Sequence, residues 1–338
     1  MQYVGLDASK ESVVAVFKDK DGKKLDEGTY PCNQKGLEKL ASDLKDCQAM
    51  VESSTTGQYV YRQLDKAGIK IKMANPSRIG LITKSEKKTD RNDADVLADL
   101  LRTNLLPTCY VPPQKIMERR ELTRQRDGLV QQTTRLKNQM HALLTSEGIS
   151  CPYADIFGKT SKEWLDGCGL SPTRKGYLLQ LKKLAGAFED EISILEKTIL
   201  EQACESDEMT LLDTMPGVAP LSALTIMAEI GDIKRFKTPE QLCSYAGLVP
   251  IVRQSGSVDY KGSVKSGNKA LKAILIKDAH SAARWNPRFR RFCRRLEKKK
   301  GKSKAITAVA HKMLRIMWFM LQRGKPFDES ILCHKRAG

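Results

Sequence analysis

The fold of this chain is decided by its first strands, in the stretch YVGLDASKESVVAVFKDKDGKKLDEGTY (residues 3–30). Short apolar runs alternate here with polar turns, which is typical of strands joined by hairpins. We predict strands at Tyr3–Ala8 and Val13–Phe17, and a third near Leu25–Tyr30 after a turn that contains Asp21-Gly22. Three consecutive strands with hairpin links form an antiparallel meander.

The segments that follow alternate between helical and strand patterns. The predicted elements are, in order, helix Gly36–Leu44, strand Ala49–Ser53, helix Tyr59–Ala67, strand Ile69–Ala74 and a helix that begins near Arg91. Strands that alternate with helices indicate an α/β layer. The order βββαβαβα is that of the RNase-H/RuvC-like arrangement. We therefore predict an α/β RNase-H/RuvC-like N-terminal domain over residues 1–110.

Four carboxylates stand out in this domain. Asp7 lies in the first strand and Glu52 ends the fourth, so adjacent strands would bring them together. Asp90 and Asp93 belong to KKTDRNDADVLADLL (residues 87–101) and lie three positions apart, on one face of a helix. Adjacent carboxylates repel one another unless a cation lies between them, and Mg²⁺ takes oxygen ligands and bridges phosphates. The four residues together predict a Mg²⁺ site.

Each of these residues alone also has a simpler explanation. The helix dipole favours Asp in the first turn of a helix, and a carboxylate at a strand end commonly faces water. Asp95 and Asp99 share the last helix, but at 100° per residue Asp95 projects well away from Asp90. We expect Asp95 and Asp99 to support the site from outside or to lie on the surface.

Pro107 and the pair Pro112-Pro113 mark a boundary, beyond which two long helices are predicted. In the first, leucines recur every seven residues, at Leu122, Leu129, Leu136 and Leu143. The second covers roughly Arg174–Ala203. The two helices could pack as an antiparallel hairpin within one chain or pair between chains. We predict a helical coiled-coil arm over residues 111–205 that mediates dimerisation, with an irregular tip at Ser150–Leu170.

Residues 206–330 predict a mainly α-helical C-terminal domain. Leu211–Phe236 has the pattern of helix, tight turn and helix, with Pro216-Gly217 at the turn and Gly231 at the end of the second helix. Such a hairpin can offer backbone amides to a phosphate, although an ordinary helical hairpin explains the pattern slightly better.

A polar, glycine-dotted loop is predicted over Arg253–Asn268, next to a helix. Its candidate nucleophiles are Ser255, Ser257, Tyr260, Ser263 and Ser266. Ser255 is followed by glycine, which leaves its hydroxyl accessible, whereas Ser266 could equally be the N-cap of the helix. Spacing alone does not choose among them, and no histidine nearby supports a Ser-His-Asp triad.

The charge of the chain is concentrated in its last third. The formal net charge is +18, and residues 206–338 hold 26 of the 58 basic residues but only 11 of the 40 acidic ones. Arg284–Lys304 contains eleven basic residues and one acidic residue. Such a distribution predicts a polyanionic partner, for which nucleic acid is the default. The interleaved Trp285, Phe289 and Phe292 could stack on bases, but their spacing favours anchoring of the helix to the core.

Composition excludes several other classes of protein. The nine cysteines include no C-x-x-C pair, which fits neither a disulfide framework nor a zinc site and indicates reduced, mostly buried thiols of a cytosolic protein. The first residues lack the pattern of a signal peptide, and no apolar stretch approaches the length of a membrane span. We expect a cytoplasmic, nucleoid-associated protein with no membrane partner.

Along nearly its whole length the chain resembles bacterial insertion-sequence transposases that join a DEDD RuvC-like domain to a serine-bearing domain, a family related to the pilin-gene DNA invertases. The segments that carry the resemblance are YVGLDASKE, VESSTTGQY, NPSRI, KTDRNDADVLA, MPGVAPLSA with AEIGDIKRF, and YAGLVPIVRQSG with KSGNKALK. The acidic positions of the family fall on Asp7, Glu52, Asp90 and Asp93, and its nucleophilic serine falls on Ser255.

The resemblance implies a site-specific recombinase that cuts and rejoins DNA through a 5′-phosphoserine intermediate, assisted by a Mg²⁺-binding carboxylate cluster. It also implies double-stranded target and donor DNA as partners, a structured guide RNA that pairs with both, and a homodimer or higher homo-oligomer. The competing hypothesis is a metal nuclease of the Holliday-junction resolvase type, with water as nucleophile. A non-catalytic nucleic-acid-binding protein is the third.

Overall fold

The computed structural model describes residues 1–76, 89–105, 108–153, 158, 161–203, 206–249, 251–255, 258–262 and 267–332. The chain divides into two compact units, Met1–Val111 and Pro112–Gly338. The boundary falls at the Pro112-Pro113 pair, where the fixed proline φ angle interrupts regular structure. The first unit contains the predicted carboxylates, and the second contains the long helices and the serine segment.

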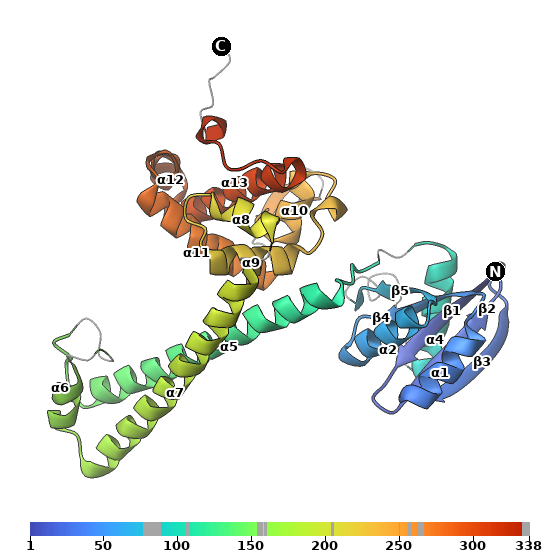
Figure 1. The fold of residues 1–338 in the computed structure, drawn as a ribbon, viewed down its shortest axis with the longest axis horizontal. Helices are drawn as coiled ribbons and strands as arrows, with labels where there is room; N and C mark the ends of the chain where they lie inside the picture. Colours follow the sequence, from blue (N-terminus) through green and yellow to red (C-terminus); the bar gives the residue numbers. More distant parts are fainter. Residues whose placement is uncertain are drawn as a thin grey trace. The chain divides into compact units, whose positions relative to one another are not determined.

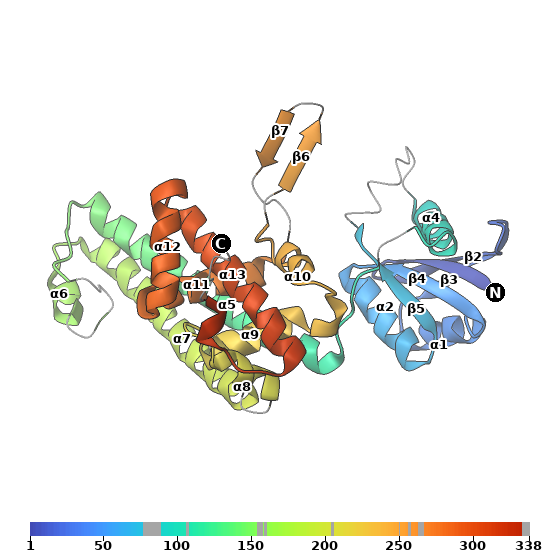
Figure 2. The same cartoon turned by 90° about the horizontal axis from the view of Figure 1, so that it is seen from above.

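The first unit is a five-stranded mixed sheet with helices on both faces (Figure 2). Its elements are β1 (Gln2–Ala8), β2 (Ser12–Lys18), β3 (Lys24–Pro31), α1 (Gln34–Asp43), β4 (Cys47–Glu52), α2 (Thr55–Lys66), β5 (Lys70–Ala74) and α4 (Asp90–Arg102). The strand order is β3-β2-β1-β4-β5, with β1 parallel to β4 and β4 parallel to β5. The predicted meander and the order βββαβαβα are both confirmed.

The two faces of the sheet are covered by different helices because side chains alternate along each strand. Val4 and Leu6 of β1 are fully buried in a cluster with residues of α1 and α2, such as Leu40 and Val60. The alternate positions of the same strand face α4. On that side Met50 of β4 belongs to a second cluster with apolar residues of α4.

The predicted arm is an antiparallel pair of helices, α5 (Gln114–Ser146) and α7 (Pro172–Ala203), which lie side by side in Figure 1. Arg126 on α5 donates to Glu196 on α7 at 3.0 Å, and Lys137 pairs with Glu189 at 2.6 Å. From Arg126 to Lys137 along α5, the partners on α7 go back from Glu196 to Glu189, so the helices are antiparallel. In this structure the two helices therefore pair within one chain, which is the first of the two arrangements that the sequence left open.

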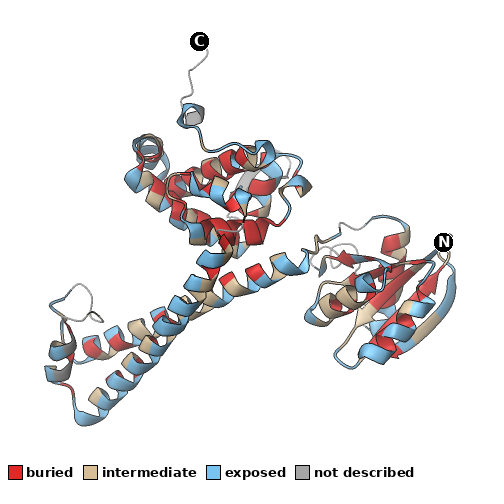
Figure 3. Cartoon of the chain, viewed as in Figure 1, coloured by how far each residue is buried: buried red, intermediate tan, exposed pale blue. Residues whose placement is uncertain are grey.

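The tip of the arm is more regular than predicted, since it contains the short helix α6 (Lys162–Gly167). Its side chains bury a small core with both long helices, in which Leu165 and Leu178 are fully buried. Elsewhere on the arm, buried residues recur only at intervals along faces that are otherwise exposed (Figure 3).

The helices of residues 206–332 form one apolar core with the C-terminal end of α7, which contributes Ile199 and Ala203. They are α8 (Asp207–Asp213), α9 (Pro220–Ile230), the 3₁₀ turn η2 (Ile233–Arg235), α10 (Pro239–Tyr245), α11 (Lys269–Trp285), α12 (Pro287–Lys300), α13 (Lys302–Arg323) and η3 (Glu329–Leu332). Between α10 and α11 lies an antiparallel hairpin of β6 (Ile251–Ser255) and β7 (Val258–Gly262). The sequence predicted a loop over Arg253–Asn268. This prediction is wrong for the first part of the segment, which forms paired strands.

Two further expectations concern the chain as a whole. In the described part of the chain, no helix has both the length and the apolar character that a bilayer span requires. The seven cysteines whose side chains are described are all free thiols, but only Cys47, Cys243 and Cys293 are buried. The expectation that most thiols are buried is thus wrong for these seven.

Candidate functional site

Asp7 lies on the face of the sheet that α4 covers, and a glycine makes this close approach possible. A Cβ atom on Gly5 would lie 1.8 Å from the carbonyl oxygen of Ala94 and 2.6 Å from the amide nitrogen of Ala98. The backbone of α4 therefore rests directly on β1 at Gly5, where no larger residue fits. Asp7 is two positions further along the strand and so shares the face of Gly5.

Glu52 joins Asp7 through the parallel pairing of β1 with β4. Leu6 is the register partner of Val51, so Asp7 and Glu52 are the next residues along two neighbouring strands. Both strands end here, at the same edge of the sheet. Glu52 is two residues beyond Met50, which packs against α4, so its position also faces that helix.

Asp90 and Asp93 complete the group from the first turn of α4. The side chain of Thr89 caps the helix by accepting a hydrogen bond from the backbone amide of Asn92. Asp90 precedes Ala94 by four residues, and Ala94 is in contact with Gly5. The helical repeat thus places Asp90 on the same line as the residues that touch β1. The segment 77–88, which leads into this turn, lies outside the described residues.

The electrostatics of Asp7 show that the four carboxylates lie close together. Its pKa is raised from 3.8 to about 6, first by burial and then by the charges of Asp90, Asp93 and Glu52, in that order. Three like charges acting on one half-buried carboxyl group disfavour its ionised form. The charges of the other three carboxylates thus act on Asp7, and among the described residues no cationic side chain is a main contributor to its pKa.

The donor set suits a hard divalent cation, since it consists of carboxylate oxygens with excess negative charge. As the side chains stand, however, no three metal-ligating residues within the described part of the chain converge closely enough to hold an ion. Bringing the carboxylates onto one ion would require rotamer changes at the exposed Asp90 or the half-buried Glu52 and Asp93.

Asp95 and Asp99 have a structural partner instead. Both accept from the ammonium group of Lys18 on β2, at 2.8 Å and 2.7 Å, and the Lys18 side chain is 5% exposed. Burial alone would lower the pKa of Lys18, but the hydrogen bonds to Asp95 and Asp99 outweigh it and raise that pKa. Asp95 and Asp99 therefore hold α4 against the sheet and lie outside the carboxylate group. A supporting position outside the site was one of the two roles expected for them.

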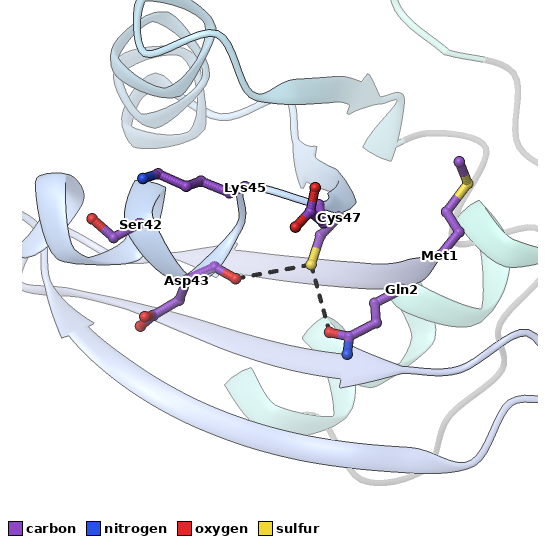
Figure 4. Close-up of a pocket in the computed structure, with 7 residues that line it drawn as sticks. Met1, Gln2, Ser42, Asp43, Lys45 and Cys47 are labelled. Atoms are coloured by element: carbon purple, nitrogen blue, oxygen red, sulfur yellow. Dashed lines mark hydrogen bonds between the residues drawn. The ribbon is translucent and has the colours of Figure 1, made fainter.

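A small pocket in the first unit is unrelated to this group (Figure 4). It is lined by Gln2, Asp43 and Cys47 among others, and the Cys47 thiol donates to the Gln2 side chain at 3.6 Å. Gln2 and Cys47 begin β1 and β4, whereas Asp7 and Glu52 lie where these strands end. The pocket is thus at the opposite edge of the sheet.

Ser255 is the last residue of β6 and pairs in register with Val258 across the hairpin. Of the other candidate nucleophiles, Tyr260 lies in β7 opposite Arg253, while Ser257, Ser263 and Ser266 lie outside the described residues. The N-cap of α11 is Asn268, whose side chain accepts from the amide of Leu271 at 3.0 Å. The alternative role of Ser266 as that cap is therefore wrong.

The hairpin is held at a narrow neck formed by two glycines. A Cβ atom on Gly267 would lie 2.6 Å from the Cα atom of Gly247, and both residues have positive φ angles, 128° and 68°. Just beyond, the backbone amide of Asn268 donates to the carbonyl of Tyr245 at 2.8 Å. The chain segments that enter and leave the hairpin are therefore fixed against each other.

A buried ion pair connects this neck to the arm. Glu229 of α9 is 0% exposed and accepts two hydrogen bonds from Arg124 of α5, at 2.7 Å and 2.8 Å. The same carboxylate accepts from Asn268 at 2.6 Å and lies 3.5 Å from Arg120. The hydrogen bond to Glu229 raises the pKa of Arg124. This cluster was not predicted, although a lone Glu in the apolar run TIMAEI signals a buried charge that needs partners.

The helical hairpin of α8 and α9 has a packing role. Gly217 in its turn has a φ of 89°, and a Cβ atom there would lie 2.5 Å from the backbone nitrogen of Ala282 on α11. Gly231 ends α9 with a φ of 68°, as predicted. The turn rests on α11, which supports the ordinary helical hairpin among the two interpretations.

The basic run Arg284–Lys304 is divided among α11, α12 and α13. Phe289 is fully buried and Phe292 packs against the same core, which confirms the anchoring interpretation for both. Trp285 is 71% exposed, so for this residue the anchoring interpretation is wrong.

Comparison with known proteins identifies the class first. A family model of the DEDD type, described as a transposase, matches residues 4–148. A second, described as the transposase IS116/IS110/IS902 family, matches residues 209–294, so the two together span both units of the chain. The chain is therefore a transposase, and it belongs to the IS110 family.

Individual relatives agree with this assignment. The chain is 26% identical to the transposase of insertion element IS1111A from Coxiella burnetii, over 85% of this chain and 80% of the relative. It is 24% identical to the IS1328 transposase from Yersinia enterocolitica, over 96% and 98% of the two chains. It is also similar to the pilin gene-inverting protein of Moraxella bovis, with 36% identity over 36% of this chain and 39% of the relative.

Proposed function

We propose that this transposase cuts and rejoins DNA at specific sites, with Asp7, Glu52, Asp90 and Asp93 holding Mg²⁺ and Ser255 acting as nucleophile. The observation that carries the proposal is the group of carboxylates around Asp7, where burial and then the charges of Asp90, Asp93 and Glu52 raise the pKa of Asp7 to about 6. Perturbed carboxylates that lack a cationic partner are typical of metal and catalytic sites.

We further propose that the first unit is RNase-H/RuvC-like. The strand order β3-β2-β1-β4-β5, in which a meander precedes two parallel strands, supports this assignment. So does the location of the carboxylates, at the carboxyl ends of β1 and β4 and in the first turn of α4. Parallel strands gather their functional groups at this edge of a sheet.

In the proposed reaction the Oγ atom of Ser255 attacks the scissile phosphorus. A bond forms between that oxygen and phosphorus, the bond from phosphorus to the 3′ oxygen breaks, and the released 3′ oxygen takes up a proton. A 3′ hydroxyl group of another strand then attacks the phosphoserine, which restores a phosphodiester and frees Ser255. Bound Mg²⁺ would supply charge neutralisation at the phosphate.

The proposed partners are target and donor double-stranded DNA, a structured guide RNA and a second copy of the chain. The names of the relatives, transposases and a pilin gene-inverting protein, support DNA as substrate. Exposed apolar side chains on α7 support self-association, since Tyr177, Leu184 and Ile194 are 47%, 51% and 60% exposed.

The carboxylates and Ser255 belong to different compact units. We propose that the active site is composite and that the two parts meet in the assembled complex, either within one chain or between protomers. Mixing a chain that carries Asp7→Asn with one that carries Ser255→Ala tests the second arrangement. Recovery of activity in the mixture supports sharing between protomers.

The decisive experiment is covalent trapping with purified protein, Mg²⁺, candidate guide RNA, and labelled target and donor DNA. We expect a protein–DNA adduct that disappears in Ser255→Ala and persists in Tyr260→Phe, a matched change on the paired strand. Cleavage without an adduct in the unmodified protein would instead establish the resolvase-type nuclease, with water as nucleophile. Retained DNA binding with no cleavage in any condition would favour a non-catalytic role.

A further inference from the structure

One face of α11 carries only exposed residues, and every ionisable group on it is basic. Lys269, Ala273, Lys277, His280 and Arg284 are all exposed. At 100° per residue they lie within an arc of about 80°. The opposite face is buried through Leu271, Leu275, Ala279 and Ala282. The basic stripe, as we call the five exposed residues, is therefore a continuous solvent-facing line about 22 Å long, at 1.5 Å per residue.

Among the described residues, no ion pair joins the stripe to a carboxylate, although the charge of Lys277 acts on the buried Asp278. Within the described residues, Lys269, Lys277 and Arg284 form no ion pair. By contrast, basic residues of the arm such as Arg126 and Lys137 are paired across α5 and α7. Within the described residues, some basic side chains of the arm are thus paired between helices, whereas those of the stripe are not.

Trp285 stands at the end of the stripe as an unusual surface residue. Its side chain is 71% exposed, and the guanidinium group of Arg284 lies 5.1 Å from the ring centroid. The other two tryptophans are packed: Trp318 donates its indole N–H to the carbonyl of Phe236 at 3.0 Å, and Trp164 packs against the core at the tip of the arm. A large exposed aromatic ring next to an arginine is suited to stack on a nucleobase.

The location of the stripe relates it to the serine hairpin. It begins at Lys269, directly after Asn268, which is held by Glu229 at the neck of the hairpin. It ends at Arg284 and Trp285, where α12 adds further exposed arginines at positions 291, 294 and 295. Nucleic acid that follows the stripe would thus extend from the neck of the hairpin to the ring of Trp285.

We infer that the basic stripe of α11 binds a nucleic-acid backbone and that Trp285 stacks on an unpaired base of the same strand. The side chains match this ligand because spaced cations neutralise successive phosphates, while an aromatic face accepts any base without selecting its sequence. Trp285 then distinguishes nucleic acid with an unstacked base from a continuous duplex.

The backbone contacts are tested by the salt dependence of equilibrium binding. Each phosphate contact that is lost reduces the slope of log K against log salt by about 0.7 for a single strand. For the full chain with Lys277→Gln and Arg284→Gln together, we expect a loss of about 1.4 in that slope on a single-stranded oligonucleotide. The matched control is Lys183→Gln with Lys197→Gln on α7, which removes the same charge from exposed positions of the arm. Equal slopes for the two double variants would overturn the inference.

The stacking contact is tested by affinity and by tryptophan fluorescence. Trp285→Ala is expected to weaken single-strand binding by roughly 5- to 150-fold, the effect of losing one stacked base, with an unchanged salt slope. Trp285→Phe should retain most of the affinity but lose the quenching of fluorescence on binding. A blunt duplex should show little difference between Trp285→Ala and the unmodified protein. No quenching, or equal losses on single strand and duplex, would contradict stacking.

Parallel titrations with DNA and RNA oligonucleotides of one sequence identify the source of the strand. Quenching by either or both supports the inference, and the tighter ligand is the physiological class. The inference rests on the proposed function only in taking nucleic acid as the partner. The stripe is tested by equilibrium binding and the serine mechanism by covalent trapping. If no adduct is trapped, the inference about the stripe is unaffected. If the oligonucleotides do not bind as expected, the serine mechanism is unaffected.

Discussion

Two buried or half-buried carboxylates, Asp7 in the first unit and Glu229 in the second, are stabilised in opposite ways. Glu229 is fully buried, yet two arginines and Asn268 surround it with donors. Asp7 is only half-buried, yet its main charged neighbours are three other carboxylates. A charge that is fully satisfied inside the fold serves structure. A charge that the fold leaves unsatisfied points to a ligand, and within the described residues no cationic side chain is among the main contributions to the pKa of Asp7.

The largest effect expected from this contrast is on catalysis. Asp7→Asn should reduce DNA strand cleavage by about 10³-fold or more, since loss of a metal contact removes several kcal/mol of stabilisation from the transition state. Gel-based cleavage assays at saturating Mg²⁺ measure the change. Asp95→Asn is the matched control on α4, because Lys18 keeps its contact with Asp99. A similar loss in both variants would assign the effect to the position of α4 rather than to the carboxylate group.

The next effect is on stability. Glu229→Ala should lower the free energy of unfolding of the second unit by about 3–5 kcal/mol, because Arg120 and Asn268 lose their buried acceptor and a cavity is left. All three tryptophans lie in this unit, so denaturant unfolding followed by tryptophan fluorescence reports on it.

The matched control for Glu229 is Glu240→Ala. Glu240 pairs with Arg315 at 3.1 Å, but its side chain is 60% exposed. Solvent screens such a pair, so a change below about 1 kcal/mol is expected. Comparable losses for the two variants would show that burial of Glu229 is not what makes its ion pair important.

A third carboxylate, Asp278, allows the contrast between satisfied and unsatisfied charges to be tested through the pH dependence of stability. Asp278 of α11 is 3% exposed and accepts only from Ser222, at 2.7 Å, while its Oδ2 atom has no partner. Burial raises its pKa from 3.8 to about 7. The unfolded chain then loses this proton at lower pH than the folded chain, so stability falls as pH rises from about 4 to about 7.

Asp278→Asn should remove this fall, which amounts to at most a few kcal/mol. Denaturant unfolding of the two proteins at pH 4, 5.5, 7 and 8 measures it. Parallel curves for the two proteins over this range would show that Asp278 ionises normally in the folded state.

The smallest effect is the stability cost of the carboxylate group itself. The pKa of Asp7 is raised from 3.8 to about 6, so the unmodified protein loses stability as pH rises between these values. At pH 7 and without Mg²⁺, Asp7→Asn should stabilise the first unit by about 1 kcal/mol after allowance for solvent screening, and the difference should vanish below pH 4. Hydrogen exchange of the β1 and α4 amides measures the first unit alone.

With added Mg²⁺ the unmodified protein should become the more stable of the two. The ion should protect the β1 and α4 amides in the unmodified protein and have little effect on Asp7→Asn. If Mg²⁺ protects both proteins equally, the carboxylate group is not where the ion binds.

Much of the first unit could be predicted from the sequence because its signals are local. Alternation of apolar and polar residues set the strands within a few residues, and Gly, Pro and Asp marked the turns. The spacing of Asp90 and Asp93 placed both on one helical turn. The β6–β7 hairpin was missed because its apolar alternation is confined to VDYK (residues 258–261), and the two strands are defined by pairing with each other.

The sequence by itself determined the order of the elements, the four carboxylates, and the concentration of positive charge in the last third. Only the tertiary structure decided which charges are satisfied. Arg124, Glu229 and Asn268 are separated by 105 and 39 residues from one partner to the next, and no local pattern links them. The exposure of Trp285 and the approach of α4 to Gly5 also depend on packing between elements that are distant in the chain. Burial and pairing are properties of such contacts, and these exist only once the chain has folded.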